Sequence, residues 1–408
     1  MGTDPAERTE NLGNSSTSSS CGSTFTPAAN NEFVSNPSHT KSGNDPPRIT
    51  LGHEGIVDII EIGSDVKRFK VGDRIICCCI RSCGKCKPCR QNRYGNCTDA
   101  IDGSWSLGHT INGMQSNYVR VPYADKQCWK LPDSVKRGSP EEDRYLMLCD
   151  ILPTSYEIGL IDGRMAPGKS MIMIGCGPVG VAGILCASAM YKLERYPEKR
   201  NVIIAIDLVD ERLNKAVAAG ATHTVKIDKS KLSEGKSYVE ACKEEVKAIL
   251  KEAYDNQDKY NLITEEDEIL SREDGMLSNQ GNSTTQCETM STSIPTEVDL
   301  VVEAVGLPSS WYLAQELVRP GGNIAILGVH GKPVQLNLET MWHRNFTLTA
   351  GMCHGYSIEH LMEKIESGDL KAEQLITHHF PLNEIQKAYD LFASRGDGVM
   401  KVLIENTV

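Results

Sequence analysis

The 408-residue chain has no excess of positive charge. It carries 43 Lys and Arg residues against 54 Asp and Glu residues, a formal net charge of −11. Proteins that bind nucleic acids or anionic membranes gather basic residues on one surface, and this balance gives no such footprint. The sequence therefore predicts a small-molecule partner, with no nucleic acid and no membrane.

Long apolar runs are also missing. No stretch of about 18 uninterrupted apolar residues occurs, and the first 30 residues lack the apolar core of a secretory signal. We expect an intracellular, cytoplasmic and soluble protein. In a reducing compartment the 15 cysteines are expected to be metal ligands where they cluster and small buried apolar groups elsewhere.

The first 47 residues have little apolar periodicity. They are rich in Ser, Thr, Asn, Gly and Pro, so they cannot bury enough surface to offset the loss of chain entropy. We predict that residues 1–47 are disordered or divergent. From residue 48 onward, short strands such as 56–63 and 69–76 are separated by Gly and Asp turns, which indicates an all-β unit.

An apolar strand at 170–174 runs into a glycine-rich turn and an apolar helix. In such a turn one glycine makes the tight bend, one admits a pyrophosphate and one lets helix and strand pack closely. The helix N-terminus adds free N–H groups and a positive dipole end. An ordinary glycine loop is the alternative, but the order of strand, turn, helix and strand favours a dinucleotide site. The turn consists of Gly175, Cys176, Gly177, Pro178, Val179 and Gly180.

The next strand, 202–206, ends at Asp207. A carboxylate there can accept hydrogen bonds from both ribose hydroxyls of an adenosine and would repel a 2′-phosphate. The sequence therefore predicts NAD rather than NADP. Further strands follow at 298–305 and 323–329, whereas the charged and polar residues 229–297, with a weak helix near 238–253, are predicted to be a surface insertion.

Four cysteines cluster in the β-rich part, at Cys83, Cys86, Cys89 and Cys97. Tight turns between them bring the sulfurs together, and four thiolates suit a closed tetrahedral zinc site. Basic neighbours help to offset the negative charge. An iron–sulfur cluster or unligated thiols are the alternatives.

Other residues that could bind metal are less clear from the sequence. Asp150 stands among apolar residues, and a buried carboxylate either caps the following helix or meets a cation. Three consecutive cysteines precede the cluster on a predicted strand, where alternation prevents all three from facing one ion, so we expect them to be core residues. They are Cys77, Cys78 and Cys79. The histidines His109, His378 and His379 are expected to be surface or packing residues.

Taken together, the ordered motifs resemble the zinc-dependent medium-chain alcohol dehydrogenases. Residues 149–154 are similar to the branch that contains glutathione-independent formaldehyde dehydrogenases and microbial secondary-alcohol dehydrogenases. The resemblance covers about 49–228 and 298–406. Its motifs are Leu51 to Gly55, Val71 to Arg74, the four cysteines, Gly175 to Gly180 and Pro320 to Gly322.

This resemblance implies an α/β protein of two domains. A GroES-like, β-rich catalytic domain would span 48–159, with the structural zinc lobe at 83–97. A doubly wound parallel-sheet NAD-binding domain, a Rossmann fold, would span 160–329 with the insertion at 229–297. Residues 330–408 would return to the catalytic domain.

The resemblance also implies roles for particular residues. His53 and Asp150 become ligands of a catalytic zinc, and Glu54 a carboxylate close behind it. The first ligand of the family is a cysteine, for which Cys21 is the nearest candidate, although its surroundings lack the Asp and His of the family motif. The implied cofactor contacts are Thr154 near the nicotinamide, Val179, Asp207 and Arg212 along the adenosine half, Leu327, Gly328 and Val329 on the nicotinamide side, and Lys401 near the pyrophosphate.

The leading hypothesis is a zinc-dependent oxidoreductase that transfers a hydride between an alcohol, or an aldehyde hydrate, and NAD. One alternative is a catalytically silent NAD-binding homologue that has lost its first zinc ligand. Another is a zinc-free reductase, against which the retained His53, Glu54 and Asp150 argue. We also expect a homo-oligomer, formed through an exposed edge strand near 323–329.

Overall fold

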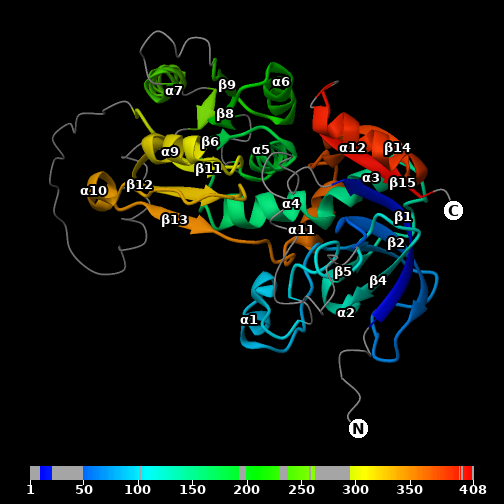
Figure 1. Ribbon diagram of the computed structural model, residues 1–408. Coiled ribbons are helices and arrows are strands. Elements are labelled where there is room, and N and C mark those ends of the chain that lie inside the picture. Colours follow the sequence, from blue (N-terminus) through cyan, green and yellow to red (C-terminus); the bar gives the residue numbers. More distant parts are fainter. Residues whose placement is uncertain are drawn as a thin grey trace, which may run out of the picture.

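The computed structural model describes residues 10–20, 49–100, 103–192, 199–228, 238–256, 259–261, 295–394, 396 and 398–406. These residues form two lobes, one around a parallel sheet and one around a mixed, mainly antiparallel sheet (Figure 1). Within the described ranges, no helix has both the length and the apolarity that a membrane crossing requires.

The parallel sheet has six strands in the order β9-β8-β6-β11-β12-β13. This is the doubly wound order, in which the chain reverses direction across the sheet between β6 and β11. The predicted α/β fold class is therefore confirmed. The bounds are β6 Met171–Ile174, β8 Ile203–Asp207, β9 His223–Lys226, β11 Val298–Glu303, β12 Val318–Ile326 and β13 Thr347–Ala350.

Both faces of this sheet are covered, which explains why β6 is apolar at every position. Met171 and Met173 join one core cluster, with helices α5 and α6, while Ile172 and Ile174 join a second, with α7 and α9. Alternation along a strand sends successive side chains to opposite faces. The helices are α5 Pro178–Met190, α6 Asp210–Ala219, α7 Tyr238–Asp255 and α9 Pro308–Leu317.

Helix α7 corrects the prediction of a surface insertion at 229–297. It presents an apolar stripe at helical spacing to the core, and it contacts α9 and β9. The apolar stripe has only about one residue in each helical turn, and the other positions are mostly charged or polar. The sequence therefore predicted only a weak helix here. The buried residues are Val239, Cys242, Val246, Leu250 and Ala253. Residues 262–294 of the predicted insertion lie outside the described residues.

The second sheet has seven strands, in the order β14-β15-β1-β2-β3-β5, with β4 paired to β1. Strands from both ends of the chain therefore meet in one sheet. The bounds are β1 Glu10–Ser20, β2 Gly55–Ile62, β3 Arg74–Cys77, β4 Tyr118–Pro122, β5 Cys128–Lys130, β14 Ile376–Pro381 and β15 Lys401–Glu405.

Strand β1 differs from the predicted disorder of residues 1–47. It pairs antiparallel with β2, β4 and β15. A ladder of backbone hydrogen bonds needs no apolar side chains, so a Ser- and Asn-rich segment can occupy this position between neighbouring strands. Of the two predicted alternatives, disordered or divergent, residues 10–20 fit the second, while residues 1–9 and 21–48, with Cys21, lie outside the described residues.

The predicted boundary at residue 329 is also too early. Strand β13, at Thr347–Ala350, completes the parallel sheet and pairs with β12. Residues 323–329 are therefore not an edge strand, because β12 lies between β11 and β13. Strand β13 has only four residues with alternating partial exposure, a pattern too short to be recognised in the sequence.

The segment between the two sheets consists of short helices. They include α3 Pro140–Leu146, α4 Ile151–Thr154, the π-helix Ser155–Ile161 and, later in the chain, α11 Ile358–Glu366. Residues of all these elements share one apolar cluster with α5, and Figure 1 places α4 and α11 between the lobes. The candidate site lies on this segment.

Candidate catalytic, cofactor and metal sites

His53 and Asp150 meet, as the resemblance implied. The Nε2 atom of His53, just before β2, lies 2.9 Å from Oδ2 of Asp150, just before α4. The two side chains are only 7% and 13% exposed. Asp150 occupies the N-cap position of α4, but its side chain makes no capping hydrogen bond. Of the two interpretations of Asp150, the structure therefore disfavours the cap.

A hydroxyl group holds the other oxygen of Asp150. Thr154 Oγ1, one turn along the chain, donates to Asp150 Oδ1 over 2.6 Å. Burial opposes a charge on Asp150, but the hydrogen bonds from His53 and Thr154 hold the pKa of this carboxyl well below its usual range. Asp150 is therefore an anion in the folded protein, with one oxygen directed at His53.

Behind His53, Glu54 forms a buried ion pair with Lys401 of β15. Both side chains are fully buried, and Lys401 Nζ donates to Glu54 Oε2. Lys401, which the resemblance implied near the pyrophosphate, thus has its ammonium in the interior beside Glu54. The pair joins the start of β2 to the last strand of the chain.

Two aromatic rings stack in series beside His53, and only His109 of the two was named in the sequence analysis. The ring of Trp105 lies 6.0 Å from that of His53, at an interplanar angle of 76°. The ring of His109 stacks on that of Trp105, with the ring centroids 4.6 Å apart and an interplanar angle of 16°. Burial and the nearby His53 lower the pKa of His109. His109 is thus a packing residue, as expected, but it belongs to an aromatic wall of this site.

The glycine-rich turn has the conformation that its sequence predicts. Gly175 has φ = 92°, in the left-handed region. A Cβ at Gly180 would lie 1.9 Å from the carbonyl oxygen of Gly175, so helix and turn are in direct contact there. A Cβ at Gly177 would meet nothing within 4 Å. Gly177 therefore leaves an open face at the N-terminus of α5, which begins at Pro178.

Asp207 lies at the carboxyl end of β8, beside this turn. Its Oδ2 accepts a hydrogen bond from the N–H of Cys176 over 2.7 Å. Its Oδ1 accepts from the N–H groups of Leu208 and Val209, at 2.7 and 3.0 Å. A carboxylate has about four acceptor positions, so the fixed group can accept a further bond. Val179 and Arg212 follow on the adjoining helices, where both are partly buried.

Glu303 is a buried acid that the sequence did not single out. It is fully buried at the end of β11, and its carbonyl oxygen accepts from the N–H groups of Leu327 and Gly328. Its Oε1 accepts from Val305 and Gly306 N–H groups, and its Oε2 lies 3.1 Å from His330 Nε2. Like Asp207, it fixes a turn at the carboxyl edge of the sheet. Val329, in the same turn, is 62% exposed.

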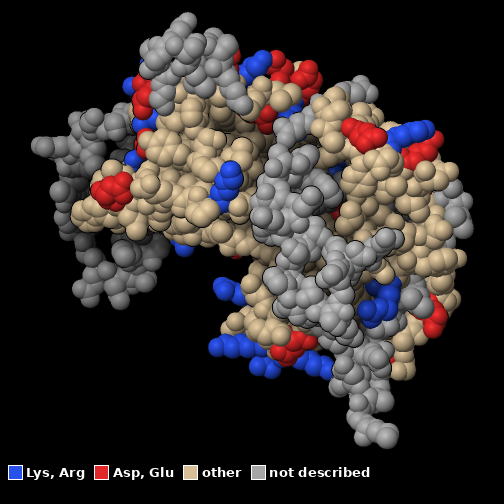
Figure 2. Space-filling model, in the orientation of Figure 1, with Lys and Arg blue, Asp and Glu red and all other residues tan. Residues whose placement is uncertain are grey.

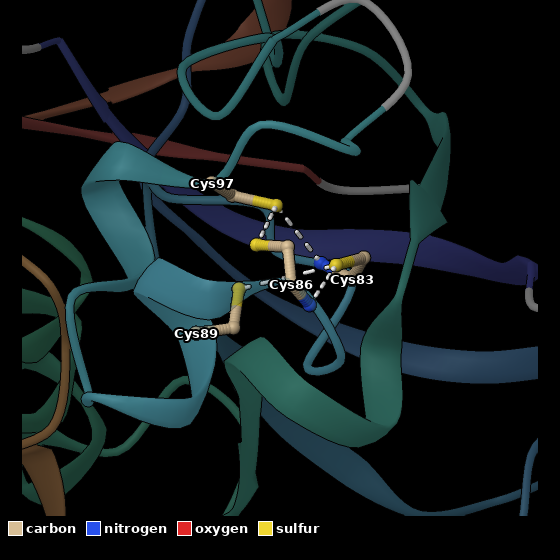
Figure 3. A group of neighbouring side chains, drawn as sticks. All are labelled: Cys83, Cys86, Cys89 and Cys97. Atoms are coloured by element: carbon tan, nitrogen blue, oxygen red, sulfur yellow. Dashed lines mark hydrogen bonds between the residues drawn. The ribbon is translucent and has the colours of Figure 1, made fainter.

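The four clustered cysteines converge as predicted (Figure 3). Their Sγ atoms all lie within 4.8 Å of one another. Cys83 Sγ lies 4.0 Å from Cys89 Sγ, and Cys86 Sγ 3.8 Å from Cys97 Sγ. A tetrahedron with zinc–sulfur bonds of about 2.3 Å has edges of about 3.8 Å, so the four sulfurs fit one zinc ion.

The surroundings of these sulfurs favour a thiolate at Cys86, whereas burial raises the pKa of Cys89 and of Cys97. The N–H groups of Lys85 and Cys86 both donate to Cys83 Sγ at 3.3 Å. Burial opposes a charge on Cys86, but hydrogen bonds from Cys89 and Thr98 lower the pKa of its thiol to about 6. Basic residues surround helix α1, Lys87–Arg90, and are seen as a blue group at the lower end of Figure 2. The exposed ones include Lys85, Lys87, Arg90 and Arg93.

The three consecutive cysteines upstream are buried, but they are not equivalent. Strand β3 ends at Cys77, whose sulfur lies 3.8 Å from that of Cys128. Beyond the strand, alternation no longer applies, and Cys78 and Cys79 both approach Cys353. The expectation of plain core packing is therefore incomplete for these two residues.

The fold and these sites define a two-domain oxidoreductase with a dinucleotide turn and a thiol-rich lobe. A family model, the alcohol dehydrogenase GroES-like domain, matches residues 16–133. The apo zinc-dependent alcohol dehydrogenase 2 from Streptococcus pneumonia is 30% identical, with a TM-score of 0.70 over 100% of this chain and 93% of that chain. The chain belongs to the zinc-dependent medium-chain alcohol dehydrogenase superfamily.

Two curated relatives match the chain over different lengths. The zinc-type alcohol dehydrogenase B of Aspergillus flavus is 24% identical over 364 residues, 87% of this chain and 69% of the relative. The glutathione-independent formaldehyde dehydrogenase of Pseudomonas aeruginosa is 35% identical over 150 residues, 35% of this chain and 37% of the relative.

Proposed function

We propose that this oxidoreductase transfers a hydride between an alcohol, or an aldehyde hydrate, and NAD, with zinc at His53 and Asp150. The observation that carries the proposal is the 2.9 Å approach of His53 Nε2 to Asp150 Oδ2. An imidazole and an ionised carboxylate from distant segments are both zinc ligands in proteins. The Asp150 side chain makes no capping hydrogen bond to helix α4 and is directed at His53 instead. This orientation supports a role beyond local structure.

Zinc held there would supply Lewis-acid chemistry, which favours ionisation of a hydroxyl group near neutral pH. The chain's own residues orient the site. Thr154 Oγ1 holds a proton in the bond to Asp150 Oδ1, so the carboxylate keeps one oxygen for His53. Trp105 covers one side of the His53 ring. Cys21 stays a prediction as the third ligand, because it lies outside the described residues.

The cofactor proposal rests on the turn between β6 and α5. The open face of Gly177 and the free N–H groups of the helix N-terminus suit a pyrophosphate. Asp207, fixed by three backbone N–H groups, suits the two ribose hydroxyls of NAD. The turn at Leu327 to Val329, anchored on Glu303, would flank the nicotinamide ring.

The four-cysteine lobe is proposed to hold a second, structural zinc ion. All four ligands are sulfurs, which leaves no open position for a substrate. A homo-oligomer also remains a proposal. Its basis is now β13, the outer strand of the parallel sheet, near the 74% exposed Trp342.

Purified protein assayed with NAD and a panel of short primary and secondary alcohols tests the proposal. We expect NADH formation that rises with added zinc and is abolished by His53→Ala and by Asp150→Ala. His378→Ala, at a partly buried histidine bonded to Thr377, is the matched control and should retain activity. Cys21→Ser decides whether Cys21 is the third ligand. No turnover at any zinc concentration would favour the catalytically silent homologue.

A further inference from the structure

Three cysteines outside both proposed zinc sites bring their sulfurs together. Cys78 and Cys79 follow β3, and Cys353 lies between β13 and α11; all three Sγ atoms lie within 4.8 Å of one another. The Sγ atoms of Cys79 and Cys353 are 3.4 Å apart although 274 positions separate the residues. The three side chains are 0%, 3% and 1% exposed.

A buried cation lies beside this cluster. The guanidinium of Arg81 is fully buried and donates through Nη2 to the carbonyl oxygen of Cys78. A buried guanidinium needs a countercharge. Among the described residues no ion pair is recorded for Arg81, and the thiols that influence it are first Cys128, whose Sγ lies 3.9 Å from Nη1, and then Cys77 and Cys78. The cluster therefore lies beside a buried positive charge, which it shares with Cys128.

Cys78 is the sulfur best placed to carry the negative charge. The N–H of Ile80 donates to its Sγ over 3.5 Å. Arg81, through its hydrogen bond to the carbonyl oxygen of Cys78, places a positive charge at the same residue. Plain apolar packing of three neutral thiols does not account for these contacts.

A glycine lets the backbone pack closely against one side of the cluster. A Cβ at Gly355 would lie 2.9 Å from Cys78 Sγ and 3.1 Å from Gln127 Oε1. Gln127 is fully buried, and its Oε1 has no hydrogen-bond partner among the described residues. A buried amide oxygen without a donor is costly. Here this oxygen and the thiol of Cys78 pack against the same glycine, Gly355.

The loop that carries Cys353 is fixed by a buried acid. Glu157 Oε2 accepts from the N–H groups of His354 and Gly355, at 2.6 and 3.1 Å. Its Oε1 accepts from the N–H and hydroxyl groups of Ser357, at 2.9 and 2.7 Å. The loop that carries the third sulfur is therefore fixed by Glu157 as well as by the contacts between the sulfurs.

We propose that Cys78, Cys79 and Cys353 form a third metal site, for a thiophilic d¹⁰ cation, Zn(II) or Cu(I). Thiolates select these ions over harder ones. Three thiolates and Zn(II) leave a single negative charge, which the neighbouring Arg81 balances. Gln127 Oε1 borders the side on which a fourth ligand would lie. The ion would join the end of β3 to the loop before α11, independently of the catalytic proposal.

Crystals of the wild-type protein, grown after reconstitution with Zn(II) or with Cu(I) under a reductant, give the most direct test. Anomalous difference maps recorded above each metal's absorption edge should show a peak between the three sulfurs for one of the two ions. This peak is separate from any peak at His53 or at the four-cysteine lobe, so failure of the catalytic proposal would not affect it. Maps without a peak at the cluster for either metal would overturn the proposal.

Metal content in solution supplies the second test. Relative to wild type, Cys353→Ser should lose one equivalent of metal per chain. Cys186→Ser, at a buried cysteine of α5 outside the cluster, should lose none. Cys89→Ser should lose one, and the double variant with Cys353→Ser should lose two. Unchanged metal content in Cys353→Ser, or a Cys79–Cys353 disulfide peptide from the metal-reconstituted protein, would contradict the site.

Discussion

Lys401 and Glu54 form a fully buried ion pair across 347 positions of sequence. Breaking such a pair leaves one charge in the interior without its partner, which typically costs about 3–5 kcal/mol. Lys401→Met should therefore lower the free energy of unfolding by that amount in urea titrations. The double variant with Glu54→Gln should lose less, because neither charge remains.

The matched control is an exposed ion pair between Lys387 and Glu384. The Lys387 side chain is 66% exposed, and its Nζ lies 2.9 Å from Glu384 Oε1. An exposed pair contributes about 0–1 kcal/mol, so Lys387→Met should have little effect on unfolding. If Lys401→Met and Lys387→Met lost equal free energies of unfolding, burial would not explain the contribution of the Lys401–Glu54 pair.

Asp207 is predicted to select NAD over NADP. Its charge would repel a 2′-phosphate, whereas its fixed oxygens suit the ribose hydroxyls. Asp207→Asn keeps the shape and one acceptor but removes the charge. Titrations of both cofactors by tryptophan fluorescence should show that the preference for NAD falls at least about tenfold, about 1.4 kcal/mol. Equal affinities in the wild type would refute the role of Asp207.

The sequence could predict contacts between residues that are close together along the chain. The glycine turn, Asp207 and the four cysteines were predictable because their chemistry lies within a few residues or one strand–helix unit. Pairings across the chain were not predictable from the residues themselves, and that of His53 with Asp150 was expected only from the resemblance. Nothing local in the sequence places Lys401 against Glu54, or Cys353 against Cys79.

Other features were missed because the sequence patterns that would indicate them are weak. Strand β1 is stabilised by backbone ladders with three strands rather than by an apolar pattern. Glu303 resembled a polar residue ending a strand, although Asp207 at the end of β8 offered a parallel that could have identified it. Only the assembled sheet shows that both acids fix turns on the same edge.

Cys89→Ser is predicted to release the metal of the four-cysteine lobe. Because the lobe has short helices and several turns, its fold depends on the ion that its sulfurs surround. We expect one fewer zinc per chain and a lower melting temperature, measured by circular dichroism. Cys186→Ser, a buried cysteine away from the lobe, controls for loss of a thiol. Unchanged zinc and melting in Cys89→Ser would refute this assignment.

His223 is predicted to make stability depend on pH. Burial lowers the pKa of His223 in the folded protein, and only part of this effect is offset by Glu252. The unfolded chain, with a histidine pKa of about 6.5, therefore binds the proton more strongly. Stability should be complete above about pH 6.5 and should fall as the pH drops below it. His223→Gln should remove this part of the pH dependence in urea unfolding series, and identical pH profiles would contradict it.

Two glycines of the cofactor turn separate binding from folding. A Cβ at Gly177 meets nothing within 4 Å, whereas one at Gly180 would lie 1.9 Å from the Gly175 carbonyl oxygen. Gly177 has φ = −72°, which alanine adopts without strain. Gly177→Ala should therefore melt like the wild type but bind NAD at least about tenfold more weakly, since its methyl group occupies the face proposed for the pyrophosphate.

Gly180→Ala should lower the melting temperature itself, because the turn and α5 must move apart. Calorimetric titration with NAD, together with melting curves of both variants, measures the two effects. Unchanged NAD affinity in Gly177→Ala would place the pyrophosphate elsewhere.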